Sequence, residues 1–256
     1  MANEKLPFTD HLDELRRRLI ICFVAIAIGF LVSYGFAEKI FQILTRPLIQ
    51  VLSVENSSPS SSLIFTGLAE GFLTYLKVAL LAGLFLATPV VFYELWKFIA
   101  PGLYRHEKRY VLPFVLLSTI FFVGGALFGY FIVFPIGFQF FIKNFTTEFI
   151  KPFPSIKEYL SFSTKLLLAF GTVFELPLFI FFLSRIGVVD AKALSRQRKY
   201  AILIIFVAAA TITPPDVISQ LMMAGPLIVL YEIGIIVARL FGKKSVPTIA
   251  DEQTEE

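Results

Sequence analysis

Long runs of uncharged, apolar residues are the feature that most limits how this chain can fold. One of them, Tyr110–Ile142, continues for 33 residues without an Asp, Glu, Lys or Arg. A helix needs roughly 20 apolar residues to cross a bilayer core about 30 Å thick, so such runs predict membrane-spanning helices. The whole chain shares this bias, since 57% of its 256 residues are apolar and only 16% are charged. The expected fold class is an all-α, polytopic membrane protein.

Six membrane-spanning segments are predicted from these runs. They are residues 19–37, 71–93, 111–134, 166–184, 200–215 and 217–238. Pro135 is expected to end the third span, because proline removes a backbone donor. Together the spans form one expected membrane domain, residues 1–242, followed by a disordered acidic tail, residues 243–256. Between the spans we expect a flexible serine-rich loop at 53–62 and a short surface helix near 157–162.

The basic residues are divided unequally between the two sides that six spans would create. Sixteen Lys and Arg residues fall in the two ends of the chain and in the segments after the second and fourth spans. Five fall in the segments on the opposite side. Because Lys and Arg are enriched on the cytoplasmic side, both termini are predicted to be cytoplasmic. The net charge of +4 is explained in this way, and no binding of nucleic acid is expected.

The common motifs of enzyme active sites do not occur in the sequence. G-x-S-x-G, H-E-x-x-H, the P-loop and G-x-G-x-x-G are all missing. The histidines, His11 and His106, and the single Cys22 lie too far apart for the spacing of metal ligands. We therefore expect no enzyme activity, no metal and no cofactor.

One acidic residue stands in the middle of a predicted span. Glu175 is ten residues from both Lys165 and Arg185, which places it near the bilayer midplane. A carboxylate there costs at least about 2.5–3.5 kcal/mol, so such residues are treated as functional by default. Pro177 leaves the carbonyl of Val173 without its helical donor, and the helix is expected to bend. Docking of a partner helix, a proton site and simple packing within the bundle all remain open.

The segment before the first span is predicted to be an amphipathic helix. Residues 8–19 place Asp13 and Glu14 four residues before Arg17 and Arg18, the spacing of helical ion pairs. Taken alone, such pairs indicate only a solvated helix face.

In the third span, the small-residue spacing Gly125-x-x-x-Gly129 is typical of a close helix–helix contact.

Five motifs extend over almost the whole chain. They are His11-Leu12-x-Glu14-Leu15-Arg16-x-Arg18-Leu19, Tyr93-x-x-Trp96-x-Phe98-Ile99-x-Pro101-x-Leu103-Tyr104-x-His106-Glu107-x-Arg109, Phe131-x-Val133-x-Pro135, Phe170-Gly171-x-x-Phe174-Glu175-x-Pro177 and Thr213-Pro214-Pro215-Asp216-x-x-Ser219-Gln220. In content and order they resemble the motifs of the TatC family, the multi-spanning receptor subunit of the twin-arginine protein translocase. Only the serine-rich loop and the tail lack matching motifs.

This resemblance implies a cup-shaped bundle of six helices. It also implies that the chain binds the twin-arginine signal peptides of folded cargo proteins at its cytoplasmic face. The expected partners are single-span TatA- and TatB-type proteins and further copies of the chain, and the expected energy source is the proton-motive force. The competing interpretation is a proton-coupled secondary transporter with Glu175 as its proton site, although no internal repeat supports it.

The resemblance also implies roles for individual residues. Glu14 and Glu107 match the carboxylates that bind the signal peptide, and Arg16 and Phe98 are assigned to the same site. Glu175 matches an intramembrane polar position that could meet a partner. The other positions of functional importance in the family are matched by Pro47, Tyr130 and Asp216. Glu94, in the same segment as Phe98, is interpreted as an acid outside the site.

Overall fold

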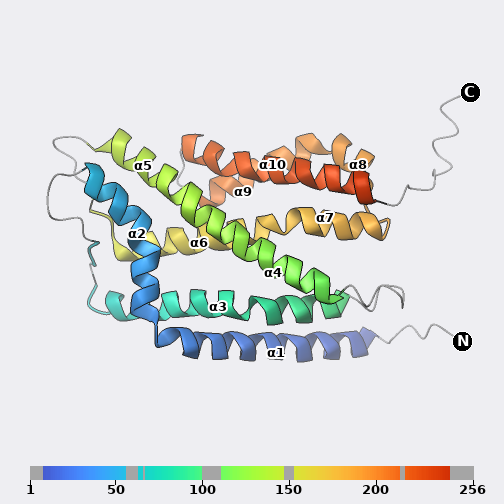
Figure 1. Ribbon diagram of the computed structural model, residues 1–256, viewed down its shortest axis with the longest axis horizontal. Coiled ribbons are helices and arrows are strands. Elements are labelled where there is room, and N and C mark those ends of the chain that lie inside the picture. Colours follow the sequence, from blue (N-terminus) through green and yellow to red (C-terminus); the bar gives the residue numbers. More distant parts are fainter. Residues whose placement is uncertain are drawn as a thin grey trace, which may run out of the picture. The chain divides into compact units, whose positions relative to one another are not determined.

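The computed structural model describes residues 8–55, 63–65, 67–99, 111–146, 153–213 and 217–242. The chain divides into two compact units, residues 1–171 and 172–256. Helices account for almost all of the described residues, and the one β-type contact among them is an isolated bridge between Ile64 and Ser155. Figure 1 shows the helices in chain order.

The described residues of the first unit form six α-helices and one π-helical turn, and the last of these helices ends just beyond the unit. They are α1 (Phe8–Tyr34), α2 (Ala37–Glu55), α3 (Glu70–Ile99), α4 (Val111–Phe128), the π-helical η3 (Gly129–Val133), α5 (Phe134–Phe145) and α6 (Ile156–Phe174). The second unit contains α7 (Leu176–Arg185), α8 (Ala191–Arg196), α9 (Arg198–Ile212) and α10 (Val217–Phe241).

The lengths and apolar character of these helices fit a protein that crosses a membrane several times. Four helical stretches in the described ranges are long and apolar enough to span, namely 70–99, 112–144, 156–185 and 217–241, and the bent pair α1 and α2 could provide a fifth. Helix α9 has only 15 residues, about 22 Å at roughly 1.5 Å per residue. The all-α, multi-pass fold class is confirmed, while the count of six spans and the side of each terminus stay predictions.

Large apolar side chains are exposed along these helices, as expected of surfaces that face lipid. On α1, Phe23 is 68% exposed and Leu31 is 70% exposed, and on α9 Ile204 is 67% exposed. In water such surfaces would favour aggregation, but acyl chains solvate them without cost. The amphipathic segment before the first predicted span joins that span without a break, since α1 is continuous from Phe8 to Tyr34.

Helices α1 and α3 pack side by side and run in opposite directions (Figure 1). The two backbones are in close contact at Gly29 and Gly83, where a Cβ built on Gly29 would lie 2.5 Å from the Gly83 carbonyl oxygen. Eleven residues away on each helix, Arg18 of α1 pairs with Glu94 of α3 at 3.0 Å. Eleven residues are about three turns, so both contacts lie on one face of each helix. The glycine contact expected in the third span is looser, because a Cβ on Gly129 would lie 3.2 Å from the Phe170 ring.

Helix α2 lies across the end of this pair, at 85° to α1. Its buried residues recur with helical spacing, among them Leu44, Leu48, Val51 and Leu52, and this face packs against α3 and α5. The sequence analysis predicted only a polar loop here and missed the helix. The end of that loop, residues 56–62, lies outside the described residues.

A proline in the middle of α2 removes one of its backbone hydrogen bonds. Pro47 has no N–H to donate to the carbonyl of Ile43, one turn earlier. The hydroxyl of Tyr130, from η3, donates to that carbonyl at 2.5 Å. In α3, Pro89 likewise leaves the carbonyl of Phe85 without its amide donor, and the hydroxyl of Thr88 donates to this carbonyl at 2.7 Å. The two prolines are therefore accommodated by hydroxyl donors.

The helix of the third predicted span continues beyond Pro135, so this proline does not end the helix, while the end of the span at Phe134 stays a prediction. Helix α4 passes through η3 into α5, which ends at Phe145. Within η3 the backbone amide of Phe134 donates to Gly129, five residues earlier, and Pro135 follows in the first turn of α5. A π-helical turn inserts one extra residue, which lets a helix continue past a site where the regular hydrogen-bond pattern cannot.

At the other end of α3, Glu70 joins two segments that are far apart in the sequence. Its Oε1 accepts hydrogen bonds from the Ser155 hydroxyl at 3.2 Å and from the Lys157 amide at 2.9 Å. Its Oε2 accepts from the Gly67 amide at 3.1 Å. The carboxylate thereby caps the N-terminus of α6, where amides lack helical partners. The predicted separate surface helix near 157–162 is instead the first part of α6.

In the second unit, α10 packs against α7, α8 and α9. Gln220 on α10 donates to the Phe206 carbonyl on α9 at 2.9 Å. Glu232, an acid in the last predicted span, pairs with Arg198 at the start of α9 at 2.8 Å. Both of these side chains are more than two-fifths exposed, so the pair adds little to stability.

The glycine contact between α1 and α3 makes a prediction about packing. Replacing Gly83 by alanine places a methyl group against the backbone of Gly29 and Phe30, and no flexible side chain is available to move away. We expect Gly83→Ala to lower the free energy of unfolding by about 1–3 kcal/mol, the usual cost of overpacking. Gly124→Ala is the matched control, since a Cβ there meets nothing within 4 Å. Thermal unfolding of the purified protein in detergent measures both, and equal stability of the two variants would contradict this contact.

The hydrogen bond between Tyr130 and Ile43 makes a prediction about coupling. Removing the hydroxyl in Tyr130→Phe should cost about 0.5–1.5 kcal/mol, because the Ile43 carbonyl loses its donor. In a Pro47→Ala background the alanine amide can donate to that carbonyl, so the same change should cost much less. A double-mutant cycle on thermal stability measures the difference. Additive losses would show that the hydroxyl does not compensate for the proline.

Candidate functional site

Three charged side chains meet where the N-terminal part of α1 packs against the C-terminal part of α3. The guanidinium of Arg18 pairs with Glu14 one turn earlier on α1, and its Nε lies 3.2 Å from Glu14 Oε1. Its Nη1 lies 3.0 Å from Glu94 Oε2. We call Glu14, Arg18 and Glu94 the ion-pair cluster. It holds two carboxylates and one guanidinium, so one negative charge is in excess.

Burial differs among the three side chains of the ion-pair cluster. Arg18 is 13% exposed and Glu94 9% exposed, whereas Glu14 is 28% exposed. A carboxylate as buried as that of Glu94 is stable only when it is paired, and Arg18 provides the pairing. Glu14 is the carboxylate of this cluster that an approaching molecule can reach.

The antiparallel register brings further residues of the predicted site to this end of the helix pair. Phe98 lies one turn beyond Glu94 on α3, and Glu14 lies one turn before Arg18 on α1, so the two residues extend toward the same end. Phe98 is half-buried and Arg16 is exposed. Next to them, the buried Trp96 donates from Nε1 to Ser118 on α4 at 2.9 Å and fixes the end of α3.

Two predicted site residues lie outside the described residues. They are Glu107, the second carboxylate of the predicted signal-binding site, and Asp216. The structure therefore brings Glu14, Arg16 and Phe98 to one end of the α1–α3 pair and leaves the position of Glu107 as a prediction.

Glu94 has an ion-pair partner that the sequence does not reveal. It was interpreted as an acid outside the site, but it is buried and bonded to the same guanidinium as Glu14. Its partner is 76 residues away in the sequence, so no local pattern marks the pair. The available signal was weaker: an acid beside a long apolar run needs a partner.

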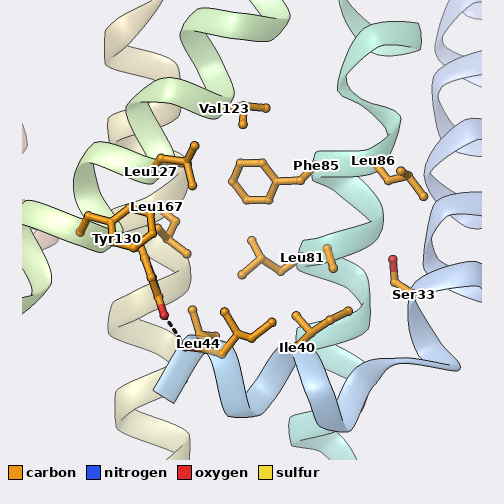
Figure 2. A pocket seen from close by; sticks show the side chains of 14 residues that line it. Ser33, Ile40, Leu44, Leu81, Phe85, Leu86, Val123, Leu127, Tyr130 and Leu167 are labelled. Atoms are coloured by element: carbon orange, nitrogen blue, oxygen red, sulfur yellow. Dashed lines mark hydrogen bonds between the residues drawn. The ribbon is translucent and has the colours of Figure 1, made fainter. Parts of the chain in front are cut away.

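Pro47 and Tyr130, two further predicted positions, form one structural unit through the hydrogen bond to Ile43. The Tyr130 ring also lines a cavity of about 570 Å³ between α2, α3 and α4 (Figure 2). Apart from Ser33 and the tyrosine, this cavity is lined by apolar residues such as Leu81, Phe85 and Leu127. The tyrosine hydroxyl is directed toward α2, where it donates to the Ile43 carbonyl (Figure 2).

Glu175 occupies the turn between α6 and α7 and is 9% exposed. Its amide donates to Thr172, three residues earlier, at 3.1 Å, and its carbonyl accepts from Phe179 at 2.8 Å. Pro177 follows within the first turn of α7. The helix is interrupted at this buried acid, while the predicted bend stays a prediction.

The described part of the chain offers little for metal ligation. No group of three or more His, Cys, Asp or Glu side chains is placed there to hold an ion. The chemistry that the ion-pair cluster can perform is recognition of a cation. A carboxylate offers about four lone-pair positions, and both bonds from Arg18 use a single oxygen of Glu14.

Comparison with known proteins identifies the family. The family model for the Sec-independent protein translocase protein (TatC) matches residues 10–226. A relative from Desulforapulum autotrophicum named Sec-independent protein translocase protein TatC is 58% identical over 241 residues, which are 94% of this chain and 87% of the relative. One of the same name from Magnetococcus marinus is 44% identical over 99% of this chain and 92% of its own.

Solved structures agree with the sequence comparison. A crystal structure of the twin-arginine translocase receptor TatC is 41% identical to this chain and superimposes with a TM-score of 0.79, over 90% of this chain and 98% of its own. A second crystal structure of that receptor, in DDM, gives a TM-score of 0.80 over 91% of this chain and all of its own. The chain belongs to the TatC family of Sec-independent protein translocase proteins.

Proposed function

We propose that this protein is a receptor that binds twin-arginine signal peptides of folded proteins at the cytoplasmic ends of α1 and α3. Membership of a family that acts in twin-arginine translocation supports the general role. The observation that carries the specific proposal is the ion-pair cluster, in which Glu14 is partly exposed and one negative charge is in excess. Glu107 is proposed as the second carboxylate.

The chemistry of guanidinium explains why a carboxylate suits this task. An arginine side chain presents a planar fork of donors that a carboxylate accepts with two parallel hydrogen bonds. The lysine ammonium is a compact point charge and cannot form that fork, so a lysine pair should bind less well. Arg16 and Arg17 are exposed beside the site and would repel a cationic peptide, which makes the carboxylate of Glu14 the attractive point.

The remaining assignments are proposals that follow from the family. Both termini lie in the cytoplasm, and the protein spans the plasma (inner) membrane. TatA- and TatB-type single-span proteins and further copies of the chain complete the translocase, which the proton-motive force drives. Phe98 and Arg16 border the signal site, Asp216 and Glu175 serve at other functional positions, and Pro47 with Tyr130 fixes α2 across the helix ends.

The role of Glu14 can be tested by binding. Hydrogen bonds to charged groups contribute about 1.5–3 kcal/mol, so Glu14→Gln should weaken binding of a synthetic twin-arginine signal peptide by roughly one to two orders of magnitude. Asp13→Asn is the matched control, because Asp13 is the exposed neighbouring acid on the same helix. Fluorescence anisotropy on the purified protein measures both affinities.

Three outcomes of that experiment are informative. A loss in Glu14→Gln but not in Asp13→Asn supports the assignment, and a twin-lysine peptide should bind weakly to every variant. If a folded Glu14→Gln protein binds the peptide with wild-type affinity, Glu14 is not part of the signal-binding site. Glu94 is unsuitable as a control acid, since it shares Arg18 with Glu14.

For Glu175 we propose a polar contact with a partner helix. The residue is buried at an interruption in a helix of apolar character. Polar side chains in membrane-spanning helices form hydrogen bonds across helix interfaces. A proton site, as the alternative of a proton-coupled transporter requires, needs a group that can ionise. The two roles therefore make different demands on the side chain.

Two substitutions separate these roles. Glu175→Gln keeps the hydrogen-bonding capacity but cannot ionise, while Glu175→Ala removes both. If the residue docks a partner, Glu175→Gln should retain much more export of a folded twin-arginine substrate than Glu175→Ala in a strain that lacks the native protein. Equal loss in both variants, at equal amounts of membrane-inserted protein, would favour the proton site.

A further inference from the structure

Arg18 occupies the carboxylate that the signal peptide is proposed to use. Both of its bonds to Glu14 go to Oε1, one from Nε and one from Nη2. A fork-shaped bond from an incoming arginine needs both oxygens of Glu14. The resident guanidinium is therefore a competitor for the same acceptor, already in place and at high effective concentration.

Glu94 lies on the opposite side of that competitor. It accepts a bond from Nη1 of Arg18 at 3.0 Å, and at 7% exposure as a residue it is too buried to meet a peptide itself. Both carboxylates attract Arg18. Because the bond to Glu94 stabilises the guanidinium, its position depends less on the bond to Glu14. Without the charge of Glu94, Arg18 and Glu14 would form a neutral pair with nothing left to attract a cation.

We propose that Glu94 is a positioning residue for signal recognition. It holds Arg18 in place, so that Glu14 can release this resident arginine and bind an arginine of the signal peptide instead. This inference rests on the proposed function, since it assumes that Glu14 binds the peptide. Signal arrival then exchanges one guanidinium for another on Glu14, while Arg18 stays paired with Glu94. The exchange leaves no buried carboxylate without a partner.

Two variants with opposite expected effects test the proposal. Glu94→Gln removes the carboxylate that competes with Glu14 for Arg18, so Arg18 pairs with Glu14 alone. The twin-arginine peptide should then bind roughly threefold to tenfold more weakly. The double variant Arg18→Gln with Glu94→Gln removes the competitor together with its partner and leaves Glu14 unoccupied. It should bind the peptide roughly threefold to fivefold more tightly than the wild type.

Controls separate this mechanism from general charge and from folding. Asp13→Asn removes one negative charge from the same helix end without touching the ion-pair cluster, and should match the wild type. Peptide affinity is measured by anisotropy on material of equal thermal stability. If Arg18 only orients the Glu14 side chain, the double variant should bind the peptide more weakly, because Glu14 would lose that orientation. The sign of the change in affinity therefore distinguishes the two mechanisms.

The outcomes show separately whether the exchange mechanism or the proposed signal site is wrong. If the double variant binds more weakly than the wild type while Glu14→Gln also loses affinity, the exchange mechanism is wrong and the proposed function stands. If Glu14→Gln binds like the wild type, the signal site itself is misplaced. Weaker binding in Glu94→Gln together with tighter binding in the double variant supports the exchange.

Discussion

Backbone carbonyls that lose their donors are the constraint on which much of this structure depends. A helix in lipid cannot use water to replace a missing hydrogen bond, yet several helices of this chain contain proline. Two of these carbonyls have a hydroxyl donor in place of the missing amide: the Tyr130 hydroxyl donates to the carbonyl affected by Pro47, and the Thr88 hydroxyl donates to the one affected by Pro89. At Pro135 the backbone adopts a π-helical turn instead. At Pro47, Pro89 and Pro135, proline therefore changes the local hydrogen bonding without ending the helix.

The contact between α1 and α3 links this framework to the candidate site. Glycine at both Gly29 and Gly83 allows the two backbones to touch, and the same register places Arg18 beside Glu94. Packing in the apolar region and ion pairing at the helix ends therefore stabilise the same arrangement. The site is positioned by rigid helices, and the buried Trp96 anchors the end of α3 against α4.

The sequence predicted the parts of the fold that depend on composition. Apolar runs identified the long helices, Pro177 identified the interruption at Glu175, and the motifs identified the family. Helix α2 was missed because its amphipathic face is hidden among polar residues next to a serine-rich stretch. Glu94 and Glu70 were missed because their partners lie 76 and 87 residues away, and only the tertiary structure brings them together. The predicted positions of Glu107 and Asp216 remain predictions.

The register of α1 against α3 also restricts how the chain lengths of relatives can vary. The glycine contact and the ion pair are separated by eleven residues on both helices. One residue inserted between them in α1 would turn Arg18 by about 100° around the helix axis, away from α3. Only an insertion at the matching place in α3, or a π-helical turn that absorbs it, could bring the charges back together. Insertions and deletions in these two segments should therefore occur in pairs during evolution.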